Sequence, residues 1–288
     1  MTTDLLTTTE TAISVRGLTK TYEEVRAVDG VDLEVHRGEV LALLGPNGAG
    51  KTTTVEILEG YRRRDAGAVS VLGTDPEGAG ATWRARIGIV LQTAPSAEEL
   101  TVTELLGHFA TFYPRPRSVD EVIAAVGLQE KRRTRVRHLS GGQRRRLDVA
   151  LGILGRPELL FLDEPTTGFD PEARREFWEL IRALSGEGTT ILLTTHYLDE
   201  AEQLADRVGV IARGRLVALD TPAALGGRDT SASVVRWRED GLPYEVSTTT
   251  PTRVVREVAE RFGGEIPELT VTRETLEDTY LRLIGEQR

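Results

Sequence analysis

Four short apolar runs stand out along the chain, and each is followed directly by glycine or polar residues. They cover residues 40–44, 87–91, 159–162 and 189–195. Continuous runs of apolar or β-branched residues, without polar alternation, are typical of parallel strands that are buried on both faces. The carboxyl ends of parallel strands gather at one edge of a sheet, where ligands bind. The pattern therefore predicts an α/β fold with a site built from the residues that follow these runs.

The first run leads into GPNGAGKT, residues 45–52, and then into a predicted helix over residues 52–61. This segment fits the P-loop pattern G-x-x-x-x-G-K-[ST], with the strand before it and the helix after it that the pattern requires. Its glycines allow backbone N–H groups and the helix N-terminus to face a phosphate. Lys51 would supply a charge to the β and γ oxygens, and the Thr52 hydroxyl would bind Mg²⁺. The alternative, a glycine-rich turn without a ligand, is disfavoured because the motif is complete.

The other runs deliver the remaining groups that a nucleoside triphosphatase needs. Residues 159–162 end at Asp163 and Glu164, which suit the Mg²⁺ shell and the γ-phosphate. Residues 87–91 end at Gln92, and residues 189–195 end at His196. Each of these polar residues taken alone could belong to a solvated turn or an ordinary surface. Together with a P-loop in the same chain, they favour a hydrolytic site.

A second glycine motif, LSGGQ at residues 139–143, starts 88 residues after Lys51 (139 − 51 = 88). The residues after it predict a helix with Leu147, Leu151 and Leu154 on one face. Ser140, Gly141 and Gly142 would then lie at a helix N-terminus, which favours an anion but has no lysine here. Two incomplete phosphate sites in one chain indicate that two copies combine them.

With these motifs, residues 13 to about 220 resemble the ATP-binding subunits of ABC transporters, in which LSGGQ is the signature motif. The resemblance implies ATP and Mg²⁺ as ligands, with Tyr22 stacked on adenine. It implies that Asp163, Gln92 and Thr52 serve the metal, that Gln92 also senses the γ-phosphate, and that Glu164 and His196 act in hydrolysis. The phosphate-binding segment that it implies is Gly45, Pro46, Asn47, Gly48, Ala49, Gly50, Lys51, Thr52 and Thr53.

The same resemblance implies that the site is shared between two copies of the chain. The residues implied to reach the ATP of the opposite copy are Ser140, Gly141, Gly142, Gln143 and Asp170. Two ATP molecules would be held between the subunits of a homodimer, and closure and opening of this dimer would be the power stroke. A separately encoded membrane permease is the second implied partner.

The implied domain order has three parts. Residues 1–12 are expected to be disordered, and residues 13–220 to form the ATPase domain. This domain would have a P-loop NTPase core of the α/β class, an antiparallel β subdomain, and a helical subdomain inserted at about residues 93–157. Residues 221–288 predict a small α+β extension, with strands at 231–236 and 244–248, a helix at 252–262 and a closing helix around Leu276, Tyr280 and Leu283. The ending LEDTYL resembles the extension of the exporter branch that handles antibiotics.

Composition narrows the function further. The chain of 288 residues has no cysteine, which excludes disulfides and thiolate zinc sites. Its net charge of −9 argues against a surface that binds nucleic acid throughout, and no apolar run is long enough for a membrane span. A basic run at residues 131–146 could bind nucleic acid, but it lacks interleaved stacking aromatics and is better interpreted as a solvated helix face.

The resemblance and the composition together predict a cytoplasmic ATPase subunit at the inner face of the cell membrane, which powers export of a small hydrophobic compound such as an antibiotic or drug. No nucleic-acid partner is expected. The alternative is a soluble ATPase of the same superfamily that acts on ribosomes or nucleic acid. One P-loop, one LSGGQ and no sustained heptads disfavour that alternative.

Overall fold

The computed structural model describes residues 10–90 and 98–286 of the chain. Two predictions fall outside these ranges: the disordered start as far as residue 9, and Gln92. Residues 11 and 12 were also expected to be disordered, but they belong to the first strand. The reason is that Thr11 pairs with His36 and that Ala12 is almost fully buried.

A six-stranded sheet forms the centre of the molecule, with the strand order β5-β6-β7-β3-β8-β9. The first five strands are parallel and only β9 runs antiparallel to its neighbour. The predicted α/β fold is therefore confirmed. The strands are β3 (Val40–Leu44), β5 (Ile87–Val90), β6 (Leu159–Asp163), β7 (Thr190–Thr195), β8 (Arg207–Ala212) and β9 (Arg215–Asp220).

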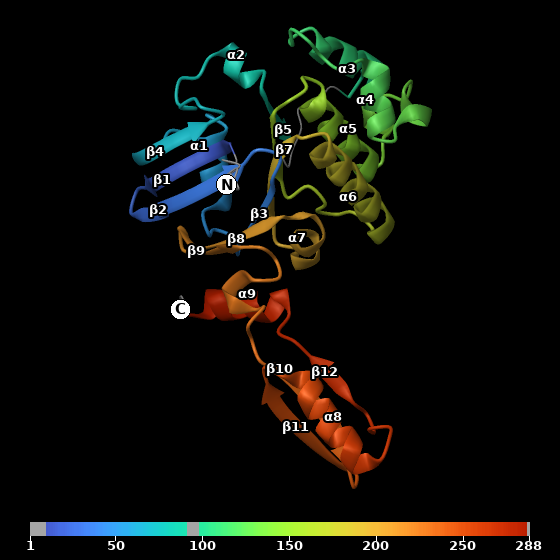
Figure 1. Ribbon diagram of the computed structural model, residues 1–288. Coiled ribbons are helices and arrows are strands. Elements are labelled where there is room, and N and C mark those ends of the chain that lie inside the picture. Colours follow the sequence, from blue (N-terminus) through green and yellow to red (C-terminus); the bar gives the residue numbers. More distant parts are fainter. Residues whose placement is uncertain (1–9, 91–97, 287–288) are drawn as a thin grey trace, which may run out of the picture.

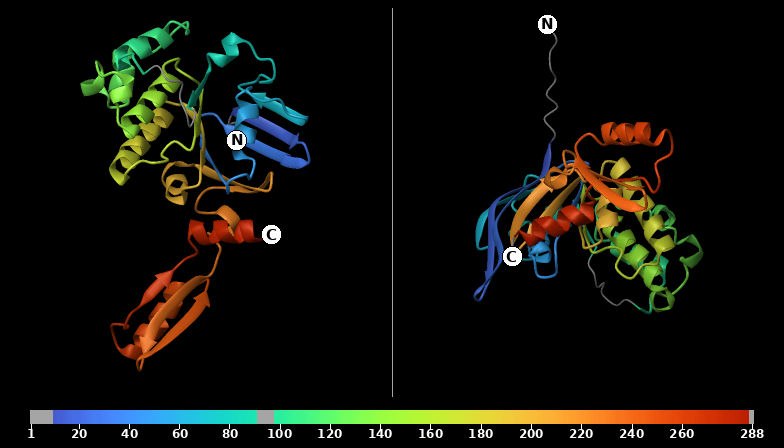
Figure 2. Two further views of the ribbon diagram at one scale, coloured as in Figure 1. Left: turned by 180° about the vertical axis from the view of Figure 1, so that it is seen from behind. Right: turned by 90° about the horizontal axis from the view of Figure 1, so that it is seen from below.

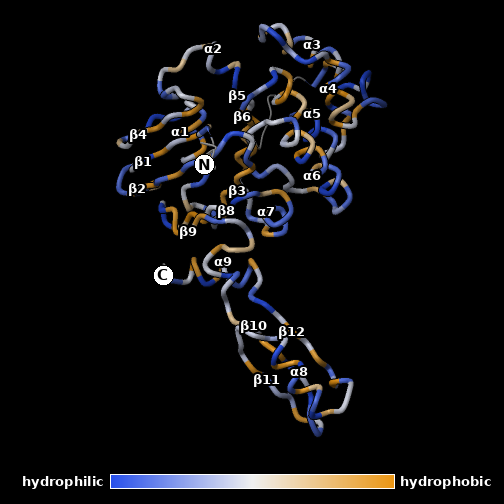
Figure 3. The backbone as a smooth tube through the Cα atoms, viewed as in Figure 1, coloured by the Kyte–Doolittle hydropathy of each residue, from blue (hydrophilic) through white to orange (hydrophobic). Residues whose placement is uncertain are grey.

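The central strands are hydrophobic throughout because both faces of the sheet are covered. Leu41 and Leu43 belong to a core shared with the β subdomain and α1, whereas Ala42 and Leu44 belong to a core shared with the helices. Successive residues of a strand point to opposite faces, so both sets are buried. Figure 3 shows the contrast between the hydrophobic central strands and the more hydrophilic outer helices such as α6.

Three β-strands pack on one side of the sheet and the inserted helices on the other (Figure 1). The strands form an antiparallel sheet in the order β2-β1-β4. They are β1 (Thr11–Tyr22), β2 (Val25–His36) and β4 (Ala66–Val71), and α1 (Lys51–Leu58) and α2 (Ala81–Arg84) lie on the same side. The helices on the other side are α3 (Val102–Ala110), α4 (Val119–Ala125), α5 (Gly141–Ile153), α6 (Pro171–Gly186) and α7 (Leu198–Leu204). Short turns are η1 (Gln129–Lys131), η2 (Val136–His138) and η3 (Leu225–Gly227).

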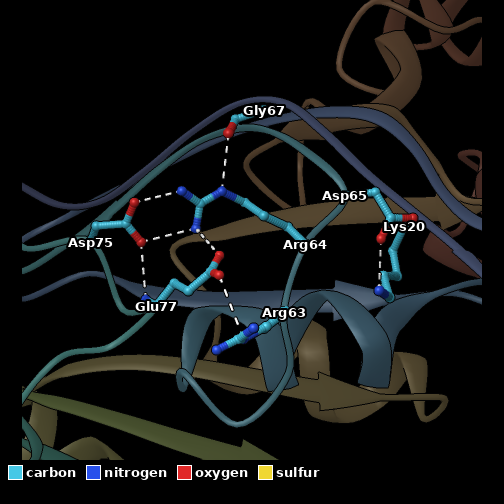
Figure 4. Close-up of polar contacts among 7 residues, drawn as sticks. All are labelled: Lys20, Arg63, Arg64, Asp65, Gly67, Asp75 and Glu77. Carbon is cyan, nitrogen blue, oxygen red and sulfur yellow. Dashed lines mark hydrogen bonds and ion pairs between the residues drawn. The ribbon is translucent and has the colours of Figure 1, made fainter.

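The loop between α1 and β4 is fixed by ion pairs (Figure 4). The Arg64 guanidinium contacts the Asp75 carboxylate through two nitrogens, at 2.9 and 2.5 Å, and its Nε donates to the carbonyl oxygen of Gly67 at 3.0 Å. Next to it, Asp65 accepts hydrogen bonds from the Lys20 ammonium at 2.7 Å and from the backbone N–H of Thr21 at 2.6 Å. The two contacts of Asp65 hold the end of β1, which carries Tyr22.

The C-terminal extension reaches away from the ATPase core and then returns to it (Figures 1 and 2). Its small sheet and α8 enclose a core of their own around Val235, Trp237, Val258 and Ile266. The closing helix behaves differently, because Leu276 and Leu283 join the large core of the helical side. The elements are β10 (Ser233–Glu239), β11 (Leu242–Thr248), α8 (Pro251–Phe262), β12 (Thr270–Thr272) and α9 (Leu276–Gly285).

These elements agree in type and order with those expected for the extension. Within residues 10–90 and 98–286, no helix combines the length and the hydrophobicity that a membrane span requires.

Candidate active site

The P-loop connects β3 to α1 in a conformation that requires glycine at its end. Gly50 has a φ of 103°, and a Cβ atom there would lie 2.3 Å from the carbonyl oxygen of Ala27. Both the left-handed backbone and the close approach exclude a larger residue. The first N–H groups of α1 have no intrahelical partner and can face an anion, whereas the Ala49 N–H in the loop donates to the carbonyl oxygen of Pro46 at 3.1 Å.

Lys51 is placed inside this loop rather than in solvent. Its ammonium donates to the carbonyl oxygens of Gly45 at 2.7 Å and Pro46 at 3.2 Å, and only 6% of the residue is exposed. Burial lowers the pKa of Lys51, and the negative charges of Glu164 and Asp163 act in the opposite direction. The ammonium is thus held near both carboxylates, where it can neutralise phosphate oxygens.

The two carboxylates lie at the end of β6, and the neighbouring strand β7 fixes them. The Thr194 hydroxyl donates to the Asp163 carboxylate at 2.5 Å, and the backbone N–H of Glu164 donates to the Thr194 hydroxyl at 3.1 Å. Glu164 has a φ of 44°, a left-handed conformation that is strained for glutamate. Such strain is retained where the surrounding structure holds a functional side chain in place.

His196 follows β7 and meets Glu164. Its Nδ1 lies 3.4 Å from Oε1 of Glu164, and 41% of the imidazole side chain is exposed. The ring also packs on that of Tyr197, with the centroids 4.1 Å apart. Two side chains expected in hydrolysis, from different strands, are therefore brought together at one edge of the sheet.

Lys51 and the two carboxylates share a cavity of about 490 Å³, which His196 does not line. The residues that line it include Tyr22, Asn47 to Thr53, Asp163 and Glu164. The guanidinium of Arg62 lies 5.2 Å from the ring centroid of Tyr22, so this ring is already part of a cation–π contact.

The oxygen atoms of the cavity suit a magnesium ion bound together with a phosphate. Thr52 and Asp163 both line the cavity, and the Thr52 hydroxyl makes no hydrogen bond within the described part of the chain. Hydroxyl and carboxylate oxygens are ligands that Mg²⁺ prefers. No group of three or more His, Cys, Asp or Glu residues that could hold a metal occurs among residues 10–90 and 98–286. The pair of Thr52 and Asp163 nevertheless fits Mg²⁺, because this ion takes most of its ligands from phosphates and water.

The LSGGQ segment begins α5, as predicted, but it lies in a different cavity. The Ser140 hydroxyl accepts from the backbone N–H of Gln143 at 3.3 Å, and the Gln143 side chain accepts from the backbone N–H of Ser140 at 3.1 Å. Residues 140–143 and Asp170 line a second cavity, of about 840 Å³. Asp170 also caps α6, because its carboxylate accepts from the N–H groups of Glu172 and Ala173. The two cavities have no residue in common.

The sequence analysis did not identify one residue that links the LSGGQ helix α5 to the end of β6. Arg145 of α5 is only 8% exposed, and it donates to the carbonyl oxygens of Pro165 at 3.0 Å and Asp163 at 2.7 Å. The interpretation of the basic run as a solvated face is therefore wrong for this arginine. The helical period of α5 could have indicated this burial, since Arg145, Val149 and Gly152 lie on one face and all three are buried.

Most of the other arginines of the basic run form ion pairs, and Arg133 is the one for which the described residues provide none. Arg132 pairs with Asp120 at 2.7 Å, Arg135 with Glu99 at 3.6 Å and Arg144 with Glu98 at 3.8 Å. Charges that are paired this way do not form a continuous basic surface for a polyanion. This agrees with a solvated face and gives no support to a nucleic-acid function.

Comparisons with known proteins identify the relatives of this chain. The family model described as ABC transporter matches residues 28–167. The chain is 41% identical to the daunorubicin resistance ATP-binding protein DrrA3 of Streptomyces coeruleorubidus, over 97% of this chain and 98% of that protein. It is 42% identical to the Nod factor export ATP-binding protein I of Ralstonia nicotianae, over 80% and 74% of the two chains.

The fold is similar to solved structures as well. A structure described as the ATP-binding subunit of an ABC transporter covers 94% of this chain and 99% of its own, with a TM-score of 0.70 and 25% sequence identity. This chain also contains the P-loop, the carboxylates at the end of β6 and the LSGGQ helix. The chain therefore belongs to the family of ATP-hydrolysing subunits of ABC transporters.

Proposed function

We propose that two copies of this chain bind and hydrolyse two ATP molecules and thereby power export through a separately encoded membrane subunit. One observation supports the proposal that two copies share each site. Lys51 and Glu164 line one cavity, whereas Ser140 to Gln143 line another. A γ-phosphate held by the P-loop of one copy can meet the LSGGQ helix only if that helix comes from a second copy. Each cavity is then half of a composite site.

The glycines of LSGGQ support this arrangement. A Cβ atom at Gly141 would meet nothing within 4 Å, and one at Gly142 would meet only the Cβ of Ala173 at 3.9 Å. Neither glycine has a positive φ. The fold of a single chain therefore does not require glycine at either position. The absence of side chains at Gly141 and Gly142 is explained if a phosphate bound by the opposite copy approaches their backbone closely.

The residues of the P-loop cavity have separate roles in this proposal. The backbone of residues 45–53 and Lys51 bind the phosphates, and Tyr22 stacks on the adenine. Thr52 and Asp163 hold Mg²⁺, with Gln92 as the third ligand expected from the sequence. When bound, the metal would neutralise charge on the phosphate oxygens. Glu164 orients the attacking water, while His196 beside it contacts the γ-phosphate.

Export of a small compound is the transport function that we propose. The relatives named above are a daunorubicin resistance protein and a Nod factor export protein, both ATP-binding subunits. A small hydrophobic compound such as an antibiotic is therefore the proposed cargo. The chain would bind at the inner face of the cell membrane through its permease. We assign residues 13–220 to the ATPase domain, about 93–157 to its helical subdomain, and 221–288 to the extension.

Light scattering on the Glu164→Gln variant tests this function. The substitution keeps the shape of the side chain but removes the charge that polarises water, so hydrolysis should fall by about 10²–10⁴-fold while ATP still binds. With Mg-ATP the mass should shift from monomer to dimer, and without nucleotide it should remain that of a monomer. A second variant, Glu164→Gln combined with Lys51→Ala, should remain monomeric. Near-normal hydrolysis by Glu164→Gln would remove Glu164 from its role, and bound ATP without a dimer would contradict the composite site.

A further inference from the structure

His196 lies against an aromatic ring to which the proposed function assigns no role. The ring centroids of His196 and Tyr197 are 4.1 Å apart, with an angle of 38° between the ring planes. Tyr197 is half-buried at the end of β7, where its backbone N–H donates to the hydroxyl of Thr195 at 3.0 Å. The imidazole itself is 41% exposed. The Tyr197 ring therefore covers part of an imidazole that is open to solvent elsewhere.

A cation lies over the same ring. The guanidinium carbon of Arg174 is 4.7 Å from the ring centroid of Tyr197, within the roughly 6 Å at which a cation and an aromatic face attract each other. Arg174 belongs to α6, whereas Tyr197 directly precedes α7. The contact thus joins two elements that follow different strands of the central sheet.

The ion pair of Arg174 does not explain this position. Its Nη1 lies 3.2 Å from Oδ2 of Asp199, but 56% of the Asp199 side chain is exposed, against 22% for Arg174. Ion pairs with so exposed a partner contribute little. A cation–π contact is stronger where the cation is partly removed from water, as the Arg174 guanidinium is.

Arg174, Tyr197, His196 and Glu164 form a continuous series of side-chain contacts. The series ends at the distance of 3.4 Å between Nδ1 of His196 and Oε1 of Glu164. With Nδ1 directed to this carboxylate, Nε2 is the imidazole nitrogen left for a γ-phosphate. Its direction depends on the second side-chain torsion of histidine, which has a broad energy minimum. A partly exposed imidazole would therefore lose this direction unless a neighbouring group restricts its rotation.

We propose that Tyr197 is a positioning residue for ATP hydrolysis, and that Arg174 in turn holds the Tyr197 ring. The inference rests on the proposed function, which gives His196 its contact with the γ-phosphate. The Tyr197 ring limits the rotation of the imidazole, and the guanidinium keeps the Tyr197 ring from turning away. Both residues act through His196, without contact to the nucleotide.

Steady-state ATPase assays on full-length variants test the proposal. Tyr197→Leu removes the ring, and hydrolysis should become about 2- to 10-fold slower, because the free energy that an aromatic pair contributes corresponds to this range. ATP affinity, measured by equilibrium binding, should change little. Tyr197→Phe keeps the ring and should restore most of the rate that Tyr197→Leu loses.

A double-mutant cycle separates positioning from a general effect on the fold. In a His196→Ala background, Tyr197→Leu should cause no further loss of rate, because the group that it positions is gone. A residue that only supports the fold would slow hydrolysis by the same factor in both backgrounds.

The contact also has a spectroscopic signature. The chain has four histidines, so NMR spectra contain few imidazole signals, and His196→Ala identifies the signal of His196. An aromatic ring changes the chemical shift of protons that lie against its face. The His196 signal should therefore move in Tyr197→Leu and stay close to its wild-type position in Tyr197→Phe.

The role of Arg174 is tested with a matched pair of variants. Arg174→Met removes the cation from the Tyr197 ring and should slow hydrolysis by at least about twofold, which is the lower end of what a cation–π contact contributes. Asp199→Asn removes only the exposed partner of the ion pair and should keep the wild-type rate. Equal rates of the two variants would show that the cation over the ring has no role.

Three outcomes would overturn the proposal for Tyr197. These are a wild-type rate in Tyr197→Leu, an equal loss of rate with and without His196, and a His196 signal that does not move in Tyr197→Leu. If Tyr197→Leu does not fold, Tyr197→Met, which fills more of the space of the ring, replaces it with the same expectations.

Failure of this proposal can be distinguished from failure of the proposed function. A normal rate of hydrolysis in His196→Ala would reject the role of His196 and, with it, that of Tyr197. Slow hydrolysis in His196→Ala together with a normal rate in Tyr197→Leu would reject only the positioning role.

Discussion

The guanidinium of Arg145 lies 2.7 Å from the backbone carbonyl oxygen of Asp163, measured from Nη2. This contact joins the LSGGQ helix to the strand that supplies the proposed metal ligand. A second bond, to the carbonyl oxygen of Pro165, holds the residues after Glu164 in the same way. We therefore expect a movement of α5 to displace the carboxylates of the same chain, which would make Arg145 a positioning residue.

Replacing Arg145 by methionine should destabilise the protein and slow hydrolysis. Methionine keeps the aliphatic stem, but the carbonyl oxygens of Asp163 and Pro165 lose their donors in a buried place. Each buried unsatisfied group costs about 1–3 kcal/mol, so we expect the two carbonyl oxygens to cost about 2–6 kcal/mol together. Urea unfolding and steady-state ATPase assays measure the two effects.

Arg144→Met is the matched control for this variant. Arg144 pairs with Glu98 at 3.8 Å, and a third of its side chain is exposed. Exposed ion pairs contribute about 0–1 kcal/mol, so this variant should remain close to wild type. Equal losses in the two variants would show that the buried contacts of Arg145 have no special role.

Gly142→Ala should separate folding from assembly. A Cβ atom at this position meets only that of Ala173 at 3.9 Å, so the single chain should be as stable as wild type or slightly more stable. Dimerisation on ATP, measured by light scattering in the Glu164→Gln background, should become weaker because the methyl group faces the approaching phosphate. A strongly destabilised monomer with normal dimerisation would contradict this explanation of the glycine.

Removal of the imidazole in His196→Ala should reduce hydrolysis more than binding. The ring lies 3.4 Å from the Glu164 carboxylate and would contact the γ-phosphate. Loss of a hydrogen bond to a charged group costs about 1.5–3 kcal/mol, which corresponds to roughly a tenfold to hundredfold slower reaction. ATP affinity, measured by equilibrium binding, should change little. A variant that binds ATP much more weakly but turns it over at the normal rate would place His196 in binding instead.

Glu59 should make the stability of the protein depend on pH. Its pKa of about 8 in the folded chain is above the usual 4.5, so the folded state keeps a proton that the unfolded chain has lost. Stability should therefore fall as the pH rises from about 4.5 to about 8, by up to about 1.4 kcal/mol per unit. Glu59→Gln removes this loss, and its advantage over wild type should be larger at pH 9 than at pH 6.

Urea unfolding followed by circular dichroism at these two pH values measures the effect of Glu59→Gln. Glu260→Gln, at an exposed position of α8, is the control and should follow the wild type. The same advantage for Glu59→Gln at both pH values would mean that burial does not hold a proton on Glu59.

The parts of the site that could be predicted from sequence are those fixed by local patterns. The P-loop spacing places Lys51 beside a buried strand, and the apolar runs place Glu164 and His196 at one sheet edge. Arg145 and Glu59 escaped prediction because their burial depends on how α5 and α1 pack against other elements. The return of α9 to the main core escaped it too, since an amphipathic helix does not reveal which surface it covers.

The contact between the helical subdomain and the central sheet depends on two facing glycines. A Cβ atom at Gly88 of β5 would lie 2.2 Å from the carbonyl oxygen of Gly152 in α5, and 2.8 Å from the side chain of Leu160. Gly88→Ala should therefore push α5 away from the sheet, which costs about 1–3 kcal/mol in a well-packed core. Since α5 also carries Ser140 and Arg145, ATPase activity should fall together with stability.

Gly107→Ala is the control that distinguishes this steric effect from a general effect of alanine. Gly107 lies in α3, where a Cβ atom would meet nothing within 4 Å. Alanine there should leave stability unchanged or raise it by up to about 1 kcal/mol, because alanine has the higher helix propensity. Thermal unfolding of both variants gives the comparison. If Gly88→Ala were as stable as Gly107→Ala, α5 could move without cost, and its contact with β5 would not hold the two subdomains together.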